Sequence, residues 1–178
     1  MQDNVSFDDI KELFLRSQIE ADRRGRETDR RLKLLGEQIG GLGNRLGEFV
    51  EGMVRPGLVR LFREVDIEVH ATHRDLAARR GDEAAQVDLI AVNDTDVVVV
   101  EVKSKLGSED VLEHAERLEK FRRLFPEYKD RTLYAALAAM IVPDNALALA
   151  ERAGMFVIGQ RGDDVAFLNG PGFARKEF

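Results

Sequence analysis

The spacing of apolar residues divides the chain into an N-terminal part with helical periodicity and a C-terminal part of short apolar runs. Between residues 32 and 53 the apolar positions follow one another in alternating steps of three and four: Leu32, Leu35, Ile39, Leu42, Leu46, Phe49 and Met53. This spacing is typical of a helix that pairs along a coiled-coil seam. We predict one long helix over about 6–49, which Pro56 breaks or restarts before a further helical stretch at Leu58–Phe62.

Two features of this helix indicate what it packs against. Several glycines interrupt the seam, and each costs a helix up to about 1 kcal/mol relative to alanine, so a partner that approaches closely is favoured. The preceding stretch, Gln18–Lys33, is too charged for a small domain to bury. We therefore predict a homodimer or higher homo-oligomer, with packing of the helix on its own domain as the alternative. The arginines of Gln18–Lys33 are interpreted as a solvated face, and contact with phosphate is the alternative.

The rest of the chain predicts strands and helices in alternation. Residues 65–73 alternate apolar and polar positions, as in a half-exposed strand, and Arg79–Glu83 is typical of a hairpin loop. Two buried strands, Gln86–Val92 and Val97–Lys103, flank the turn Asn93–Asp96. We then expect a helix over 104–125 with Ser108 as cap, a strand over 132–142, a helix over 143–153, and short strands over 155–159 and 165–168. This order predicts an α/β fold with a mixed sheet flanked by helices.

The composition narrows the chemistry. The 178 residues have room for one ordinary domain and an accessory segment, and the absence of cysteine excludes disulfides, zinc–thiolate sites and cysteine nucleophiles. The start Met-Gln-Asp-Asn lacks the features of a signal peptide, and no apolar stretch has the length of a membrane span. We therefore expect a cytoplasmic protein without membrane contact. A net charge of −6 is not typical of a non-specific nucleic-acid binder, although binding follows the local field.

Three charged residues interrupt the two buried strands. If the turn between the strands is symmetric, Val92 lies opposite Val97, Asp88 lies opposite Glu101, and Lys103 shares the face of Glu101. Two opposed carboxylates repel each other and are costly to bury, and a divalent cation between them removes both problems. The alternative is a buried charge network without catalysis, in which one carboxylate pairs with the lysine.

These residues resemble the motif of the PD-(D/E)XK nuclease superfamily, which has the restriction-endonuclease-like fold. Asp88 and the triplet Glu101-Val102-Lys103 lie on consecutive strands of a hairpin, with a helix after it and an acidic helix before the sheet. The likeness extends over about 47–168, and Val87 replaces the proline of the motif. More narrowly, a group of bacterial proteins with a coiled-coil N-terminus has runs similar to Gly47–Gly52, Val100–Ser104 and Phe125–Lys129.

The resemblance implies a role for each matching residue. Asp88 and Glu101 hold Mg²⁺ or Mn²⁺, with the carbonyl of Val102 as a possible further ligand. Lys103 orients or deprotonates the attacking water and offsets charge at the phosphate. A metal suits phosphodiester hydrolysis because it stabilises the developing charge and generates the nucleophile.

The resemblance also implies a glutamate on the first core helix, for which Glu51 is the better match and Glu48 the alternative. On this interpretation, residues 1–46 form an oligomerisation coiled coil, and residues 47–178 form a nuclease-like domain that acts as a metal-dependent endonuclease on DNA or RNA. The alternative function is a catalytically inactive scaffold that binds a partner protein through its coiled coil.

Overall fold

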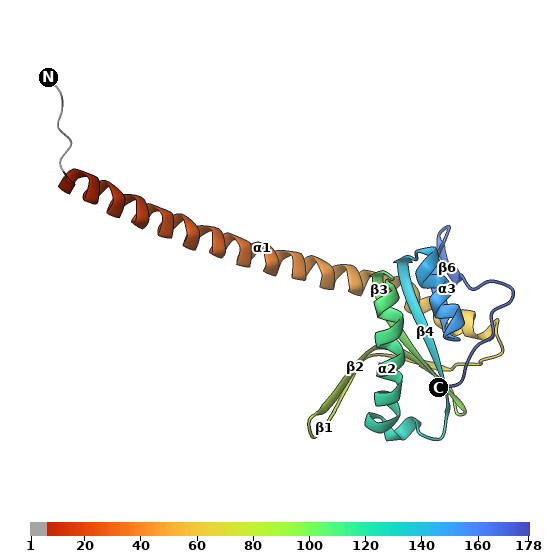
Figure 1. Cartoon of the computed structure of the whole chain (residues 1–178). Coiled ribbons are helices and arrows are strands. Elements are labelled where there is room, and N and C mark those ends of the chain that lie inside the picture. Colours follow the sequence, from red (N-terminus) through yellow and green to blue (C-terminus); the bar gives the residue numbers. More distant parts are fainter. Residues whose placement is uncertain (1–6) are drawn as a thin grey trace. The chain divides into compact units, whose positions relative to one another are not determined.

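A computed structural model describes residues 7–178, shown in Figure 1, and within 7–46 it describes the side chains of 16, 18, 20, 23, 24, 26–28 and 30–36. The chain divides into two compact units, residues 1–44 and 45–178. Ile39, Leu42 and Leu46 of the expected seam lie outside the described side chains. The pairing of 1–46 with a second copy, and its separation from a nuclease-like domain at 47–178, stay predictions.

The first helix does not break at its proline, contrary to the sequence prediction. Helix α1 runs without interruption from Phe7 to Arg63 and contains Pro56. A proline inside a helix removes one hydrogen bond and clashes with the carbonyl four residues earlier, at a cost of about 3 kcal/mol. Gly52, which carries that carbonyl, and Pro56 are both exposed, whereas Val54 and Leu58 are buried. Water can therefore bind the freed carbonyl, while burial of the opposite helix face outweighs the cost.

The second unit contains one six-stranded mixed sheet, which confirms the predicted architecture. The strands lie in chain order, and the β3–β4 and β4–β5 pairs are parallel while the others are antiparallel. The strands are β1 (Ala71–Arg80), β2 (Glu83–Val92), β3 (Asp96–Lys105), β4 (Thr132–Ile141), β5 (Phe156–Arg161) and β6 (Asp164–Phe167). The helices after α1 are α2 (Ser108–Leu124), the short 3₁₀ turn η1 (Pro126–Tyr128) and α3 (Asp144–Arg152).

Helices cover both faces of this sheet, as seen around the sheet in Figure 1. Alternate residues of β3 face opposite sides: Val99 packs with the buried face of α2, and Val98 and Val100 pack with residues 50–62 of α1. Apolar side chains make up both clusters, which explains why the strands are nearly continuous apolar runs. The odd-numbered positions of β3 therefore face α2, and Glu101 and Lys103 share them.

The first strand begins later than the alternation at residues 65–73 predicted. The backbone turns at Asp66, where φ is +59°, and the amide of Ile67 donates back to the carbonyl of Phe62 at 2.9 Å. Ile67 and Val69 are buried against the end of α1 without forming a strand. Burial under the helix and burial on a sheet face give the same alternating pattern, so the sequence could not separate them. The loop after β1 is also shorter than expected, because only Gly81 and Asp82 leave the strands.

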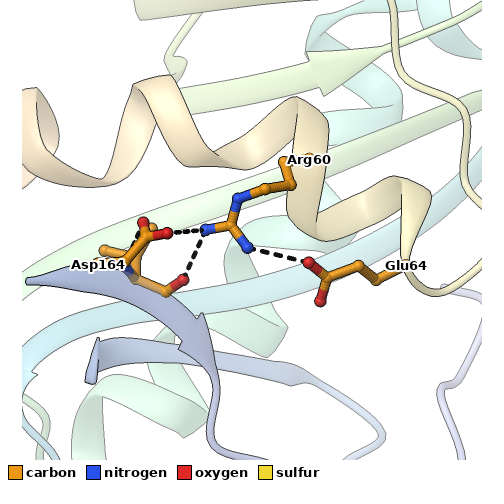
Figure 2. A network of polar contacts seen from close by, with 4 residues as sticks. Arg60, Glu64 and Asp164 are labelled. Carbon is orange, nitrogen blue, oxygen red and sulfur yellow. Dashed lines mark hydrogen bonds and ion pairs between the residues drawn. The ribbon is translucent and has the colours of Figure 1, made fainter. Parts of the chain in front are cut away.

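Arg60 joins the end of α1 to the last strand (Figure 2). Its guanidinium donates to Asp164 Oδ2 at 2.8 Å, to the carbonyl of Val165 at 3.0 Å and to Glu64 Oε1 at 2.9 Å. All three side chains are about half exposed or more, so the pairs add little stability individually. Their geometric effect is to fix the angle at which α1 meets the edge of the sheet.

The residue that caps α2 differs from the sequence prediction. Gly107, not Ser108, is the residue that caps α2, and its amide donates to the side chain of Asp110 at 2.7 Å.

Within the described residues, 7–178, no helix has the length and apolar character that crossing a bilayer requires.

Candidate functional site

The hairpin of β2 and β3 has the predicted register up to the point where its charged residues begin. Val92 pairs with Val97, and the ladder continues to the pair of Leu89 and Val100. At the next position Asp88 intervenes: its Oδ2 accepts a hydrogen bond from the backbone amide of Val102 at 2.8 Å. A side-chain oxygen thus takes the place of a backbone carbonyl in the ladder. The two strands separate at Asp88, and their separation opens the site.

Glu101 is the most deeply buried carboxylate of the site, with 5% of the residue exposed. Both of its oxygens have cationic partners: Oε1 lies 3.3 Å from Lys103 Nζ, and Oε2 accepts from the guanidinium of Arg117. Lys103 also contacts Asp110 Oδ1 at 3.1 Å. A buried carboxylate needs such partners, because leaving the charge unpaired is strongly destabilising. The result is a continuous charge network that links β3 to α2.

The charge of Asp88 acts on two other carboxyl groups. Burial raises the pKa of the Glu101 carboxyl, and the charge of Asp88 raises it further, against the opposing effects of Arg117 and Lys103. Burial also raises the pKa of Glu51 on α1, and Asp88 is again the next cause. Asp88 therefore acts electrostatically on a carboxyl from each of two other elements. Repulsion between carboxylates of this kind favours cation binding.

Glu51 is the helix glutamate that the structure brings toward Asp88. The charge of Asp88 affects the pKa of Glu51 more than the charge of the neighbouring Glu48 does. Glu48 lies on the exposed side of the helix. Arg74 of β1 partly compensates this repulsion. Glu101 and Lys103 thus form an ion pair, Asp88 is bound to the backbone amide of Val102 between them, and Glu51 interacts with Asp88 electrostatically.

The environment of Lys103 favours a charged ammonium. Burial lowers its pKa, but the hydrogen bond to Asp110 and the charges of Glu101 and Asp110 outweigh burial, so the pKa of Lys103 is raised. A lysine that removes a proton from water at neutral pH needs the opposite shift. In this arrangement Lys103 is suited to neutralising charge and orienting water.

Arg117 of α2 belongs to the site, and His114 lies one turn before it; the sequence analysis assigned neither. His114 is fully buried; its Nε2 lies 3.3 Å from the carbonyl of Val99, and its Nδ1 has no hydrogen-bond partner. Burial, with the charge of Arg117, lowers the pKa of His114 to about 4, so it is neutral. Arg117 lies one turn after His114 and four residues before buried Phe121. That helical spacing was the available signal, because it puts Arg117 on the sheet-facing side.

A pocket of about 510 Å³ lies between the hairpin and α2. Its lining includes four carboxylates and two basic groups: Asp88, Glu101, Glu113, Glu116, Arg117 and Lys120. Within the described residues, no group of three or more His, Asp or Glu side chains is arranged to hold a metal ion. Mg²⁺, however, usually takes only one or two carboxylates and keeps several waters. Asp88 and Glu101 provide hard oxygen ligands of this type, so these two residues fit a Mg²⁺ ion.

Comparisons with known proteins place the chain in a family. A family model described as "Domain of unknown function (DUF8196)" matches residues 59–167, which include Asp88, Glu101, Lys103 and Arg117 but not Glu51. A search of curated proteins finds no match.

Two solved structures are similar to part of the chain. A repair endonuclease from Pyrococcus abyssi is 20% identical, with a TM-score of 0.43, over 60% of this chain and 45% of that one. A protein of unknown function, AF1548, is 17% identical, with a TM-score of 0.41, over 57% of this chain and 54% of that one. The chain thus spans about half the length of each.

Proposed function

The chain belongs to the DUF8196 family, a family of domains of unknown function, and we propose that it is a metal-dependent nuclease of the PD-(D/E)XK type. The proposed substrate is a phosphodiester bond of DNA or RNA, and the proposed cofactor is Mg²⁺ or Mn²⁺. The observation that carries the proposal is the position of Asp88: it lies where β2 and β3 separate, and its charge acts on both Glu101 and Glu51.

Each residue has a defined task in this proposal. Asp88 and Glu101 hold the cation, with the carbonyl of Val102 as a further ligand, and Glu51 supports it from α1. When bound, the metal supplies Lewis-acid stabilisation and an activated water. Lys103, protonated and held by Glu101 and Asp110, offsets negative charge at the phosphate. The amide of Val102 fixes Asp88, so that the carboxylate is oriented before any ligand arrives.

A specific observation also favours the second candidate, a catalytically inactive scaffold. Glu101 has both oxygens paired with basic side chains, so the charge network is satisfied without a metal at that residue. Asp88 distinguishes the two candidates, since no ion pair in the described part of the chain neutralises it. In a purely structural network, the charge of Asp88 would raise the pKa of two other carboxyls with no ion pair to compensate it.

The test is hydrolysis of labelled DNA and RNA, single- and double-stranded, with Mg²⁺ or Mn²⁺. We expect Asp88→Asn and Glu101→Gln each to reduce the rate by on the order of 100-fold or more. Asp163→Asn, in the exposed turn between β5 and β6, is the matched control and keeps full activity. Calorimetry with Mn²⁺ should show binding by the unmodified protein and none by Asp88→Asn. Folded protein that neither binds Mn²⁺ nor hydrolyses any of the substrates would favour the scaffold.

We further propose that the chain forms a homodimer through its N-terminal helix. Leu32 and Leu35, two residues of the expected seam, are 61% and 52% exposed, as is required of side chains that pair with a second copy. A dimer brings two sites to one substrate molecule, which suits cuts in both strands of a duplex.

A further inference from the structure

Arg117 is the basic residue of α2 that contacts Glu101. Its guanidinium donates to Glu101 Oε2, and only 27% of its side chain is exposed. Lys103 occupies the other oxygen of the same carboxylate. Within the described residues, neither cation forms an ion pair with Asp88, whose Oδ2 is bound by a backbone amide and whose Oδ1 has no hydrogen-bond partner.

The guanidinium therefore compensates only one of the two carboxylate charges at this site. It neutralises Glu101 but leaves the repulsion between Asp88 and Glu101 in place. A divalent cation between the two carboxylates removes that repulsion as well, and it needs an oxygen of Glu101 that Lys103 or Arg117 now occupies. Lys103 is held from its other side by Asp110, whereas among the residues that the structure describes only Glu101 accepts a hydrogen bond from the Arg117 side chain. Arg117 is thus the cation that a metal can displace.

The pocket beside Arg117 gives the displaced side chain a place to go. Its lining carries four carboxylates against Arg117 and Lys120, so without a metal the pocket repels an anionic ligand. A divalent cation balances these charges. The planar guanidinium fork then matches the oxygens of a phosphate group.

We propose that Arg117 is the internal counter-cation of Glu101, that a divalent metal displaces its guanidinium, and that the displaced guanidinium binds a phosphate oxygen of the substrate in the adjoining pocket. This inference rests on the proposed nuclease function. Nucleic acid then binds only after the metal. Arg117 first competes with the metal for Glu101 and afterwards binds the substrate.

The first test measures Mn²⁺ affinity by calorimetry on the full chain without nucleic acid, at about pH 8, well above the ordinary pKa of a carboxyl group. Because Arg117→Met removes the competing charge, we expect it to bind Mn²⁺ at least about tenfold more tightly than the unmodified protein. Lys120→Met is the matched control, since it removes a cation of the same helix and pocket that does not contact Glu101. We expect it to change affinity by less than about threefold. Equal or weaker Mn²⁺ binding by Arg117→Met overturns the inference.

A second variant keeps the test decisive if Arg117→Met does not fold. Arg117→Lys retains a charge to pair with Glu101 but loses the guanidinium fork, so it should fold and bind Mn²⁺ more tightly than the unmodified protein by a smaller factor. Mn²⁺ should also raise the melting temperature of each folded Arg117 variant by more than it raises that of the unmodified protein. An equal rise in all of them contradicts displacement.

The third measurement is binding of a short DNA duplex and of an RNA strand, with Ca²⁺ in place of Mn²⁺ to slow hydrolysis. The unmodified protein should bind one of them only when Ca²⁺ is present, and Arg117→Met should bind it at least about tenfold more weakly despite its tighter metal site. Unchanged nucleic-acid binding by Arg117→Met overturns the second half of the inference.

The outcomes separate this inference from the proposed function. Mn²⁺ binding that depends on Asp88 but not on Arg117 overturns only the role of Arg117. If instead the unmodified protein binds no Mn²⁺, or Asp88→Asn binds it equally well, the proposed metal site itself is wrong, and the role of Arg117 is wrong with it.

Discussion

Asp88, at the point where β2 and β3 separate, has several structural and electrostatic effects at once. Its carboxylate is a hydrogen-bond acceptor for Val102, the electrostatic neighbour of Glu101 and Glu51, and a wall of the pocket. These effects have opposite consequences for stability. The hydrogen bond favours the fold, whereas the charge makes it harder to keep Glu101 and Glu51 ionised.

A first prediction concerns pH and uses Asp88→Asn, which keeps a hydrogen-bond acceptor and removes the charge. The folded pKa values of Glu101 and Glu51 are raised, so folded protein binds these protons more tightly than unfolded chain. The stability this gives is complete below about pH 4.5 and is lost as the pH rises through the raised pKa values. We expect urea unfolding to show a smaller loss above pH 4.5 in Asp88→Asn than in the unmodified protein. Parallel pH profiles would contradict the coupling.

A second prediction concerns His114, whose pKa shift has the opposite sign. Because burial lowers its pKa to about 4, the unfolded chain binds this proton more readily than the fold does. Stability is complete above the ordinary value of 6.5 and is lost as the pH falls toward 4. The difference corresponds to about 3 kcal/mol.

The measurement is the free energy of unfolding in urea at several pH values between these two. The unmodified protein should lose up to about 3 kcal/mol more on acidification than His114→Gln, which stays neutral and keeps a donor near the carbonyl of Val99. His73→Asn, on the exposed side of β1, should follow the unmodified protein. A variant at His114 that loses stability as steeply as the unmodified protein would refute the assignment.

At the scale of elements, α1 positions Glu51 by packing closely on the sheet. Gly57 is buried on the side of α1 that faces β6, and a Cβ added there would meet the methyl group of Val165 at less than a van der Waals distance. Arg60, one turn later, ties the helix to the same strand. Close approach at Gly57 and the contacts of Arg60 together set where the first core helix lies, and with it Glu51.

A third prediction follows for this helix. Gly57→Ala should lower the free energy of unfolding by about 1–3 kcal/mol, because the added methyl group overpacks the contact with β6. Gly52→Ala is the matched control, since nothing lies within 4 Å of an added Cβ there, and alanine should stabilise the helix by up to about 1 kcal/mol. Urea unfolding of both variants gives the comparison. Equal effects would mean that helix propensity, not packing, decides at both positions.

At the scale of the whole molecule, the two units differ in how they bury apolar surface. Residues 45–178 have an apolar cluster on each side of the sheet. In the helical stretch 30–36, by contrast, every described side chain is exposed, including Leu32, Leu34 and Leu35. A helix of this kind depends on a partner for stability, because isolated helices are marginal in water.

A fourth prediction tests whether a second copy is that partner. Sedimentation analysis should show a dimer for the full chain and a shift toward monomer for Leu35→Glu, which places a charge in the seam. Leu34→Glu is the matched control, because Leu34 is equally exposed but lies off the three-four spacing. A monomeric full chain, or equal effects of the two substitutions, would refute pairing through this seam.

Local sequence patterns account for the order of the elements in this fold. Periods of two and 3.6, turn residues and helix stops located most elements, and counting outward from the turn placed Val92 opposite Val97. Local patterns determine these features because each element's period is set by its own backbone geometry. Long-range packing, in contrast, settles whether the helix continues through Pro56, where β1 begins, and that Arg117 joins Lys103 in pairing with Glu101. Those outcomes depend on burial and charge between residues distant in sequence, for which a single chain's pattern has no period.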